Sequence, residues 1–336
     1  MGNPWDYDFS AIGRTAPLLI VHGGDSDPAV KSQGGGFLGR GNSDVYKLLG
    51  ENAVFDQVNL SKAFQDNHPR PDVARFERVL NLVTDPDQHK RTLETLEKML
   101  RKYRGQVINR PEAVLRTSRD QVAKRLAGIA GLHVPKVIRL RSGKADAAVQ
   151  AVERAGFAFP GILRIAGTHT GNIVGIVAGL DELRAGLIDA GDHVLTEFVD
   201  FRSADGLYRK YRFFVFGPRA VFRHMIAADN WNVHARDRMR FMVELPHLLE
   251  EEARLFEREK EVFPAWVLAV VEAVRQRLGL DFFGVDFGLS QSGEVVLFEA
   301  NATMNFFPFM RDPRFAYIER CLEPAQRAFR QLLGQP

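Results

Sequence analysis

Apolar side chains alternate with small and polar ones in two runs near the C-terminal end of the chain, and this pattern predicts a β-hairpin. The first run, residues 282–289, places Asp286 on the face opposite the large apolar side chains, between two glycines. The second run, residues 295–301, places Glu299 and Asn301 together on one face. The pattern therefore predicts that two acids and an amide gather on two paired strands.

The length of the connecting turn decides whether the two acids meet. A loop of two or four residues, taken from residues 291–294, puts Asp286 and Glu299 on the same face, with about 5 to 8 Å between their side-chain origins. A three-residue loop would put them on opposite faces. Two carboxylates and an amide on one face suit a hard cation such as Mg²⁺, which takes oxygen ligands and keeps sites open for water or phosphate. Acids that only face solvent are the alternative, and the apolar flanking runs favour the metal site.

The first 112 residues show strands that alternate with a helix, which predicts an open α/β domain. Apolar runs at residues 17–21, 79–83 and 107–109 are the expected strands. A helix is expected from Thr84 to Gly105, with a capping residue, a proline in its first turn and leucines at a spacing of three and four. The glycine-rich segment 32–41 predicts a surface loop rather than a phosphate-binding one.

The rest of the chain predicts a mixture of helices and hairpins. A small-residue loop at residues 166–172 joins two expected strands, and backbone N–H groups in such a loop can bind phosphate. A plain turn is the equal alternative. Residues 226–234 form a polar loop that is a candidate for facing a substrate. Further strands are expected at residues 194–200, 211–216 and 220–223, and helices at residues 117–131, 248–261, 266–278 and 318–333.

Composition and charge exclude several classes of protein. Lys and Arg number 45 against 42 for Asp and Glu in 336 residues, so the net charge of +3 gives no reason to expect a nucleic-acid partner. The single cysteine, Cys321, excludes an internal disulfide and a cysteine metal cluster. No signal peptide and no apolar stretch of about 20 residues is present. We therefore expect a soluble, cytoplasmic protein without a membrane partner.

The order of these motifs resembles the ATP-grasp superfamily. GVDF at residues 284–287, followed by LFEAN at residues 297–301, is similar to the metal-binding end of that family, and the resemblance extends over roughly residues 113–310. It implies an α/β and α+β fold with ATP bound between two lobes. The implied division is an N-terminal open α/β (pre-ATP-grasp) domain at 1–112, a small ATP-grasp lobe at 113–196, and a large lobe with the metal site at 197–336.

The resemblance also implies roles for particular residues around ATP. Asp286, Glu299 and Asn301 would hold Mg²⁺, with Mn²⁺ as an alternative, against the ATP phosphates. Arg164 stands where the family has a phosphate-binding lysine, so the charge is kept but the geometry of a planar guanidinium differs. The loop over the nucleotide would comprise Gly167, Thr168, His169, Thr170 and Gly171. Residues Glu197, Phe198 and Val199 would hold adenine, and Asp200 would reach the ribose.

Two arginines on the expected hairpin, Arg212 and Arg223, stand where family members bind the transferred phosphate and the acyl group, and they are the candidate catalytic residues. A further phosphate-binding basic residue is implied near the entry to the small lobe, with Arg119 and Lys124 as the two candidates. The segment after Asn301 lacks the glycine-containing turn of many members, which leaves the acceptor substrate open.

The resemblance implies a ligase similar to the glutathione synthetase and ribosomal-protein glutamate ligase type. Such an enzyme activates a carboxylate as an acyl phosphate with ATP and joins it to an amine or another nucleophile. Small-molecule or peptide substrates are expected, and a homodimer is common among members. The alternatives are an ATP-grasp kinase that phosphorylates a small molecule and a non-catalytic ATP-binding module.

Overall fold

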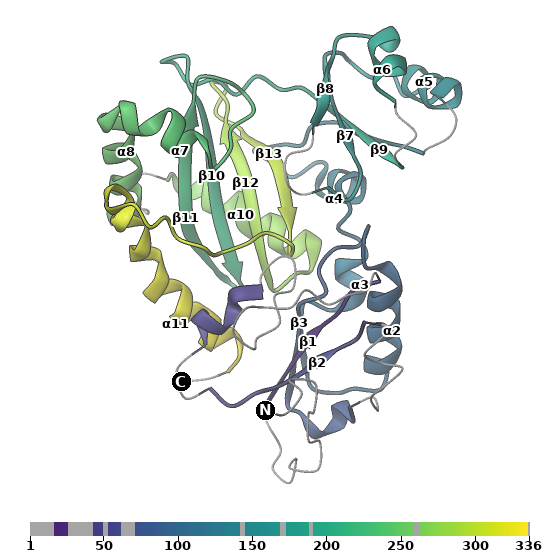
Figure 1. Cartoon of the computed structure of the whole chain (residues 1–336), viewed down its shortest axis with the longest axis vertical. Helices are drawn as coiled ribbons and strands as arrows, with labels where there is room; N and C mark the ends of the chain where they lie inside the picture. The colour runs from purple at the N-terminus through teal and green to yellow at the C-terminus, as the bar shows by residue number, and fades with distance from the viewer. Residues whose placement is uncertain are drawn as a thin grey trace, which may run out of the picture.

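The computed structural model describes residues 17–25, 43–49, 53–61, 71–141, 145–168, 173–187, 191–258 and 263–334. The chain forms three sheets within these residues, and helices cover them (Figure 1). The architecture is the mixed α/β and α+β one that the sequence predicts. The glycine-rich segment 32–41 lies outside the described residues.

The N-terminal domain is built on a parallel sheet in the order β2-β1-β3-β4. The two central strands are almost completely buried, as is usual for parallel strands covered on both faces. The helix α2 (Lys90–Leu100) packs its leucine stripe of Leu93, Leu96 and Leu100 against the sheet. The other elements are β1 (Leu18–His22), η2 (Ser43–Leu48), β2 (Asp56–Asn59), η3 (Val73–Arg75), β3 (Arg78–Asn81), β4 (Gln106–Ile108) and α3 (Pro111–Val114).

The helix that was expected to begin at Thr84 begins at Lys90. Asp85 accounts for the difference, because its Oδ1 accepts hydrogen bonds from the backbone N–H groups of Asp87 and Gln88 (2.9 and 3.0 Å). These bonds hold residues 85–88 in a turn before the helix starts. Acids in such positions compete with the helix for backbone donors.

The small lobe is an antiparallel sheet in the order β6-β9-β7-β8, with α5 and α6 packed against it. It projects from the rest of the molecule (Figure 1). Its core contains Leu140, Val149, Val152, Leu163 and Leu195. The elements are β6 (Val137–Leu140), α5 (Ala145–Arg154), β7 (Gly161–Ile165), β8 (Ile173–Val177), α6 (Leu180–Gly186) and β9 (His193–Glu197).

The large lobe is centred on a five-stranded sheet in the order β11-β10-β12-β13-β5. The strand β5 (Leu132–His133) pairs in parallel with β13, and α4 (Arg119–Leu126) packs against α10. From sequence these two elements were expected in the small lobe; β5 pairs with the large-lobe sheet, whereas α4 contacts both α10 and β6 of the small lobe. The remaining elements are β10 (Tyr208–Phe216), β11 (Arg219–Ala228), α7 (Asp237–Arg240), η4 (Met242–Glu244), α8 (Pro246–Glu257), α10 (Ala265–Leu278), β12 (Phe282–Leu289), β13 (Val295–Asn301), η5 (Pro313–Cys321) and α11 (Leu322–Leu332).

The key hairpin, β12 and β13, has Asp286 directly opposite Glu299. The reason differs from the one expected. Leu289 pairs with Val295, so five residues form the turn, and this odd number alone would place Phe298 opposite Asp286. A β-bulge, at which the register shifts between Asp286 and Phe287, restores the pairing of the two acids.

The N-terminal domain is joined to the large lobe by a shared core and by one buried asparagine. Asn109 adopts a left-handed conformation (φ 56°) directly after β4. Its side-chain oxygen accepts hydrogen bonds from the N–H groups of Asp281 and Phe282 (3.0 and 2.9 Å), and its amide donates to the Phe282 carbonyl (2.6 Å). The carboxyl end of β4 is therefore fixed to the start of β12. Among the helices described, we find none with the length and apolarity needed to span a bilayer.

Candidate functional site

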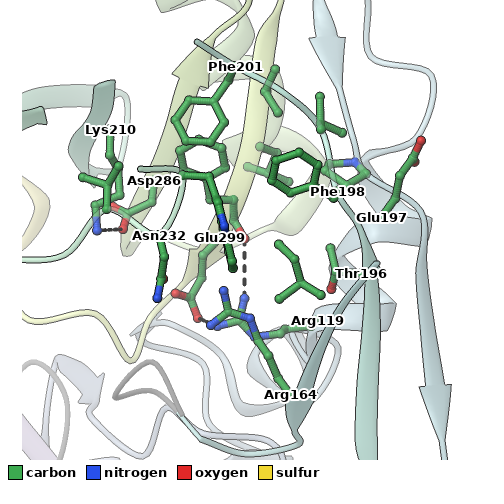
Figure 2. Close-up of a pocket in the computed structure, with 18 of the residues that line it drawn as sticks. Arg119, Arg164, Thr196, Glu197, Phe198, Phe201, Lys210, Asn232, Asp286 and Glu299 are labelled. Atoms are coloured by element: carbon green, nitrogen blue, oxygen red, sulfur yellow. Dashed lines mark hydrogen bonds and ion pairs between the residues drawn. The ribbon is translucent and has the colours of Figure 1, made fainter. Parts of the chain in front are cut away.

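A cavity of about 270 Å³ lies between the small-lobe sheet and the large-lobe sheet. Its walls come from strands on both sides and from α4, and the candidate acids Asp286 and Glu299 lie in it. Figure 2 shows Phe198 and Phe201 in one part of the cavity and Arg119 and Arg164 in another. The cavity is therefore aromatic at one end and charged at the other.

The aromatic end is formed by four side chains that contact one another in pairs. The rings of Phe198 and Trp231 are 5.7 Å apart and nearly perpendicular, and the rings of Phe201 and Phe298 are 4.5 Å apart. Phe298 reaches the cavity because the bulge in β13 lets Leu297, Phe298 and Glu299 all line it. Such a set of rings suits a flat, apolar group.

Asp286 is held by two cations from β10. The guanidinium of Arg212 donates from Nε to Oδ1 and from Nη2 to Oδ2 (2.5 and 2.7 Å), and Lys210 Nζ lies 3.7 Å from Oδ2. Burial acts to lower the pKa of Arg212, but the attraction and hydrogen bonds of Asp286 together with the charge of Glu299 outweigh it, and the pKa is raised. Burial together with the charge of Arg212 outweighs the attraction of the same carboxylate at Lys210, so the pKa of Lys210 is lowered.

Glu299 is held by a cation from α4 and by the neighbouring amide. Its Oε1 accepts hydrogen bonds from Arg119 Nη2 (2.7 Å) and from Asn301 Nδ2 (2.8 Å). The Asn301 oxygen accepts instead from the backbone N–H groups of Thr303 and Met304 (2.9 and 3.1 Å). These two donors fix which way the amide points, because the reversed amide would set its own donors against them. Asn301 thus orients Glu299 and the segment that follows it.

The donors available for a metal ion are the two facing carboxylates. Among the residues described, no cluster of three or more His, Cys, Asp or Glu side chains could hold a metal. Mg²⁺ is commonly bound by one or two carboxylates together with substrate phosphates and water. Asp286 and Glu299 therefore fit an ion whose other ligands come from a phosphate chain. The third expected ligand, Asn301, lies beside Glu299, with its side-chain oxygen bonded to the N–H groups of Thr303 and Met304.

Two arginines from different elements meet at the charged end. Arg164 on β7 lines the cavity, and its pKa is lowered to about 10 by burial and by the nearby charge of Arg119, while Glu299 acts in the opposite direction. Arg119, one of the two candidates at the lobe entry, lines the same cavity. The other, Lys124, is 68% exposed and lies 3.9 Å from Asp120 on the same helix. The geometry thus favours Arg119 for an anion bound in the cavity.

The segment expected to hold adenine lines the aromatic end in part. Glu197, Phe198 and Val199 line the cavity, whereas Asp200 does not. Glu197 accepts a hydrogen bond from the Lys136 backbone N–H (3.0 Å). Both oxygens of Asp200 accept from the Arg202 guanidinium, Oδ1 from Nε (3.1 Å) and Oδ2 from Nη2 (2.5 Å), and these hydrogen bonds lower the pKa of Asp200. The structure thus turns Asp200 toward the surface.

The expected phosphate loop is described only at its start. Gly167 adopts a positive φ of 70°, and its carbonyl accepts a hydrogen bond from the Gln88 side chain of the N-terminal domain. The Thr168 hydroxyl donates to the Ile165 carbonyl (2.7 Å). His169, Thr170 and Gly171 lie outside the described residues.

The candidate catalytic arginines occupy different places. Arg212 lines the cavity beside Asp286, whereas Arg223 is buried next to the segment after Asn301. Arg223 donates to the backbone carbonyls of Phe306 and Pro308 (2.7 and 3.1 Å) and lies over the Phe309 ring. Burial lowers the pKa of Arg223 to about 10. Arg223 therefore holds the segment that follows Asn301 and does not line the cavity.

Several residues that line the cavity were not singled out from sequence. Lys210 is the most informative, since it lies two positions before Arg212 on the same strand and so shares its face. Trp231, Asn232 and His234 lie in the polar loop 226–234 that was expected to face a substrate, and they line the cavity. The alternation of Lys210 with Arg212 was a visible signal, whereas the aromatic contacts of Phe201 and Phe298 depend on the fold.

Comparisons with known proteins bear on the fold. No protein-family model matches the sequence, and no curated protein matches it. Among solved structures, the chain is similar to the D-Ala:D-Ser ligase VanG from Enterococcus faecalis, with a TM-score of 0.50 and 14% identity over 93% of this chain and 98% of that one. It is also similar to a RimK-domain ATP-grasp protein from Sphaerobacter thermophilus (TM-score 0.52, 14% identity, 94% and 99% coverage).

A third similar structure is the ATP-grasp ligase PsnB in complex with a precursor peptide and AMPPNP. Its TM-score is 0.51 and its identity 13%, over 96% of this chain and 98% of that one. All three matches cover nearly the whole of both chains. The chain therefore has the ATP-grasp fold, and the fold that the order of motifs predicts is confirmed.

Proposed function

We propose that this protein is an ATP-dependent ligase that activates a carboxylate as an acyl phosphate and joins it to an amine. One observation carries the proposal. A single cavity between the lobes of an ATP-grasp fold combines an aromatic end with four cations, Arg119, Arg164, Lys210 and Arg212, and two facing carboxylates. A nucleoside triphosphate has the same division, with a flat base at one end and a phosphate chain at the other.

The aromatic end would bind the base. Phe198 and Trp231 on one side and Phe201 and Phe298 on the other supply apolar contact, and the chain at Glu197 and Val199 borders the same space. The charged end would bind the phosphates. Arg119 and Arg164 converge there from α4 and β7, so the two lobes each contribute a cation to a bound anion.

Asp286 and Glu299 would hold a magnesium ion, or manganese in its place, against the phosphate chain. Such an ion offsets charge on the terminal phosphate and fixes its orientation when bound. Asp286 would then bind both the ion and Arg212. The guanidinium of Arg212 would also contact the transferred phosphoryl group. Asn301 keeps Glu299 in position through its 2.8 Å hydrogen bond.

The chemistry follows from phosphoryl transfer without a nucleophile from the protein. A carboxylate oxygen of the substrate attacks the terminal phosphorus, the bond to the bridging oxygen breaks, and ADP leaves. The amine nitrogen then attacks the acyl carbon, and phosphate leaves with the bonding electrons while the nitrogen loses a proton to solvent. Positioning and charge neutralisation are the main demands of such steps.

The substrates that we propose are amino acids or peptides. One similar structure is a D-Ala:D-Ser ligase, and another holds a precursor peptide. The segment after Asn301, which Arg223 holds through the carbonyls of Phe306 and Pro308, would border the acceptor.

A two-stage experiment tests the proposal. Thermal unfolding is first followed with Mg²⁺ and AMPPNP, for which we expect a higher melting temperature. ADP and free phosphate are then measured with ATP, a panel of amino acids and peptides, and an amine. A ligase releases phosphate only when the nucleophile is present, whereas a kinase leaves the phosphate on the acceptor. Stabilisation by nucleotide with no turnover on any substrate would instead identify a non-catalytic binding module.

A further inference from the structure

Lys210 occupies an unusual position for a lysine in a cavity. It lies on β10, two residues before Arg212, and its side chain is only 15% exposed. Its ammonium lies 3.7 Å from Oδ2 of Asp286, whose side chain is 6% exposed. A largely buried ammonium beside a buried carboxylate places a positive charge where the proposed metal ion would bind.

The two carboxylates are already engaged by protein cations. A carboxylate has about four lone-pair positions. At Asp286, Arg212 takes one position on each oxygen, and Lys210 lies against the second oxygen. At Glu299, Arg119 and Asn301 both donate to Oε1. Side chains of the protein thus already supply much of the positive charge around the two carboxylates and occupy several of their lone-pair positions, which a pair of divalent ions would otherwise do.

The charge balance of the site points in the same direction. At the charged end, four cations lie near two carboxylates: Arg119, Arg164, Lys210 and Arg212 against Asp286 and Glu299. Glu197, the third carboxylate of the described lining, borders the aromatic end and accepts a hydrogen bond from the Lys136 backbone N–H. A free divalent cation is repelled by such a surplus of positive charge, whereas a triphosphate with about four negative charges is attracted. With the triphosphate bound, about two negative charges are left over, and one divalent ion cancels them.

We infer that the ammonium of Lys210 is a resident cation of the phosphate site, so that the site takes one divalent ion per nucleotide and takes it only together with the nucleotide. The inference rests on the proposed ATP-binding function and adds to it a metal stoichiometry and an order of binding. Lysine can serve this role because its ammonium is a compact point charge with three donors, which can contact Asp286 and a phosphate oxygen at once.

Manganese binding tests the inference without any measurement of turnover. The full chain is titrated with Mn²⁺, and free Mn²⁺ is measured by electron paramagnetic resonance, first alone and then with saturating AMPPNP. Nucleotide binding is measured separately by calorimetry. We expect no saturable Mn²⁺ binding without the nucleotide and one Mn²⁺ per bound AMPPNP with it. Two Mn²⁺ per AMPPNP, or tight Mn²⁺ binding to the nucleotide-free chain, would overturn the inference and leave the proposed function standing.

A pair of variants assigns the effect to Lys210. Lys210→Met keeps the length of the side chain and removes the charge, so we expect a second Mn²⁺ to bind per AMPPNP. Lys90→Met is the matched control, because the exposed side chain of Lys90 on α2 pairs with Glu94 (3.8 Å), and it should keep one Mn²⁺. If Lys210→Met folds and still takes one, Lys210 is not the resident cation. If AMPPNP binds to no form of the protein, the ATP-binding function itself fails and the inference with it.

Discussion

At the scale of single residues, the site is organised by charges that hold each other in place. Asp286 and Glu299 meet because they are paired across two strands, and each is oriented by a guanidinium, Arg212 for one and Arg119 for the other. Breaking a buried pair by removing one partner leaves a charge without compensation. Neutral variants of similar shape also remove one partner's charge, but they keep the volume and a hydrogen-bonding oxygen, so they disturb the packing less than truncation to alanine does.

Glu299→Gln is expected to abolish ATP turnover with little loss of folding. The amide keeps the shape of the side chain but removes the charge that would hold a metal ion, and we expect a loss of about 100-fold or more in kcat. Turnover is measured by ADP release, and folding by the melting temperature. Glu294→Gln, in the exposed turn of the same hairpin, is the control and should retain full activity. Unchanged turnover in Glu299→Gln would mean that the metal assignment is wrong.

A buried histidine predicts how stability depends on pH. Burial lowers the pKa of His22 from 6.5 to about 4, and its Nε2 is hydrogen-bonded to the Tyr46 hydroxyl (2.7 Å). Between these two values the unfolded chain binds the proton and the folded chain does not. The free energy of unfolding is therefore unaffected by the titration of His22 above about pH 6.5. It falls as the pH is lowered from 6.5 toward 4, by about 3 kcal/mol in total.

Urea unfolding at pH 7 and pH 5 measures this effect. In the natural protein the free energy of unfolding should be lower at pH 5 than at pH 7. In His22→Gln this difference should be smaller, because the variant lacks the imidazole that takes up a proton on unfolding. His247→Gln, at an exposed position, should show the same fall as the natural protein. An equal pH dependence in His22→Gln would contradict the assignment.

At the scale of elements, the β12–β13 hairpin carries both the carboxylates and one wall of the aromatic end. Its five-residue turn and its bulge act together, since either alone would separate the acids. The bulge also turns Phe298 into the cavity next to Phe201. Gly288 on the neighbouring strand makes room for these two rings: a Cβ there would lie 2.7 Å from each of them.

Gly288→Ala is accordingly expected to weaken AMPPNP binding by about tenfold. The added methyl group overpacks the site, so the rings of Phe201 and Phe298 must move away from the positions in which they would contact the base. Calorimetry gives the affinity, and circular dichroism shows whether the fold is kept. Gly175→Ala on β8 is the matched control, since a Cβ there meets nothing within 4 Å and its φ is ordinary. An unaltered affinity in Gly288→Ala would show that the rings do not contact the nucleotide.

At the scale of the whole molecule, the cavity exists because three sheets are held in one arrangement. Asn109 links the N-terminal sheet to the start of β12, and Arg139 of the small lobe forms ion pairs with Asp87 of the N-terminal domain (2.6 Å) and with Asp120 on α4 (3.3 Å). The small lobe therefore contacts both neighbours, and the cavity between the lobes keeps its shape through side chains far from the candidate acids.

Asn109→Ala tests the link between the N-terminal domain and the large lobe. The substitution leaves the N–H groups of Asp281 and Phe282 and the Phe282 carbonyl without partners, which should lower the free energy of unfolding by about 2 to 4 kcal/mol. Urea unfolding measures the loss. Asn230→Ala, an exposed position, should change stability little. A loss below about 1 kcal/mol in Asn109→Ala would show that the link is not a major source of stability.

Much of this arrangement could be predicted from the sequence, and its limits have physical causes. Alternation by twos located β12 and β13, and a spacing of three and four located α2, because local periodicity reflects which face is buried. The pairing of Asp286 with Glu299 was predicted correctly, but through an even-numbered loop. The odd loop and the compensating bulge leave no periodic signal, since a bulge is a defect in the period itself.

Other departures arose where a residue's partner lies far away in the sequence. Arg212 and Arg223 look alike on adjacent strands, yet one faces the cavity and the other binds the carbonyls of residues 306 and 308. Likewise Arg119 and Lys124 share one helix, and the packing of α4 on α10 and β6 decides which of them lines the cavity. Such choices depend on rotation of an element against its neighbours.

By itself, the sequence determined the elements, their order and the kinds of side chain available, because hydrophobic periodicity and turn residues act over a few neighbouring positions. Only the tertiary structure decided which of those side chains share one cavity: four cations, three carboxylates and four aromatic rings from α4, β7, β9, β10, β12, β13 and the connecting segments 198–201 and 231–235. The physical reason is that the charge and shape of a site depend on residues that packing brings together from distant parts of the sequence. No short stretch of the chain contains all of them.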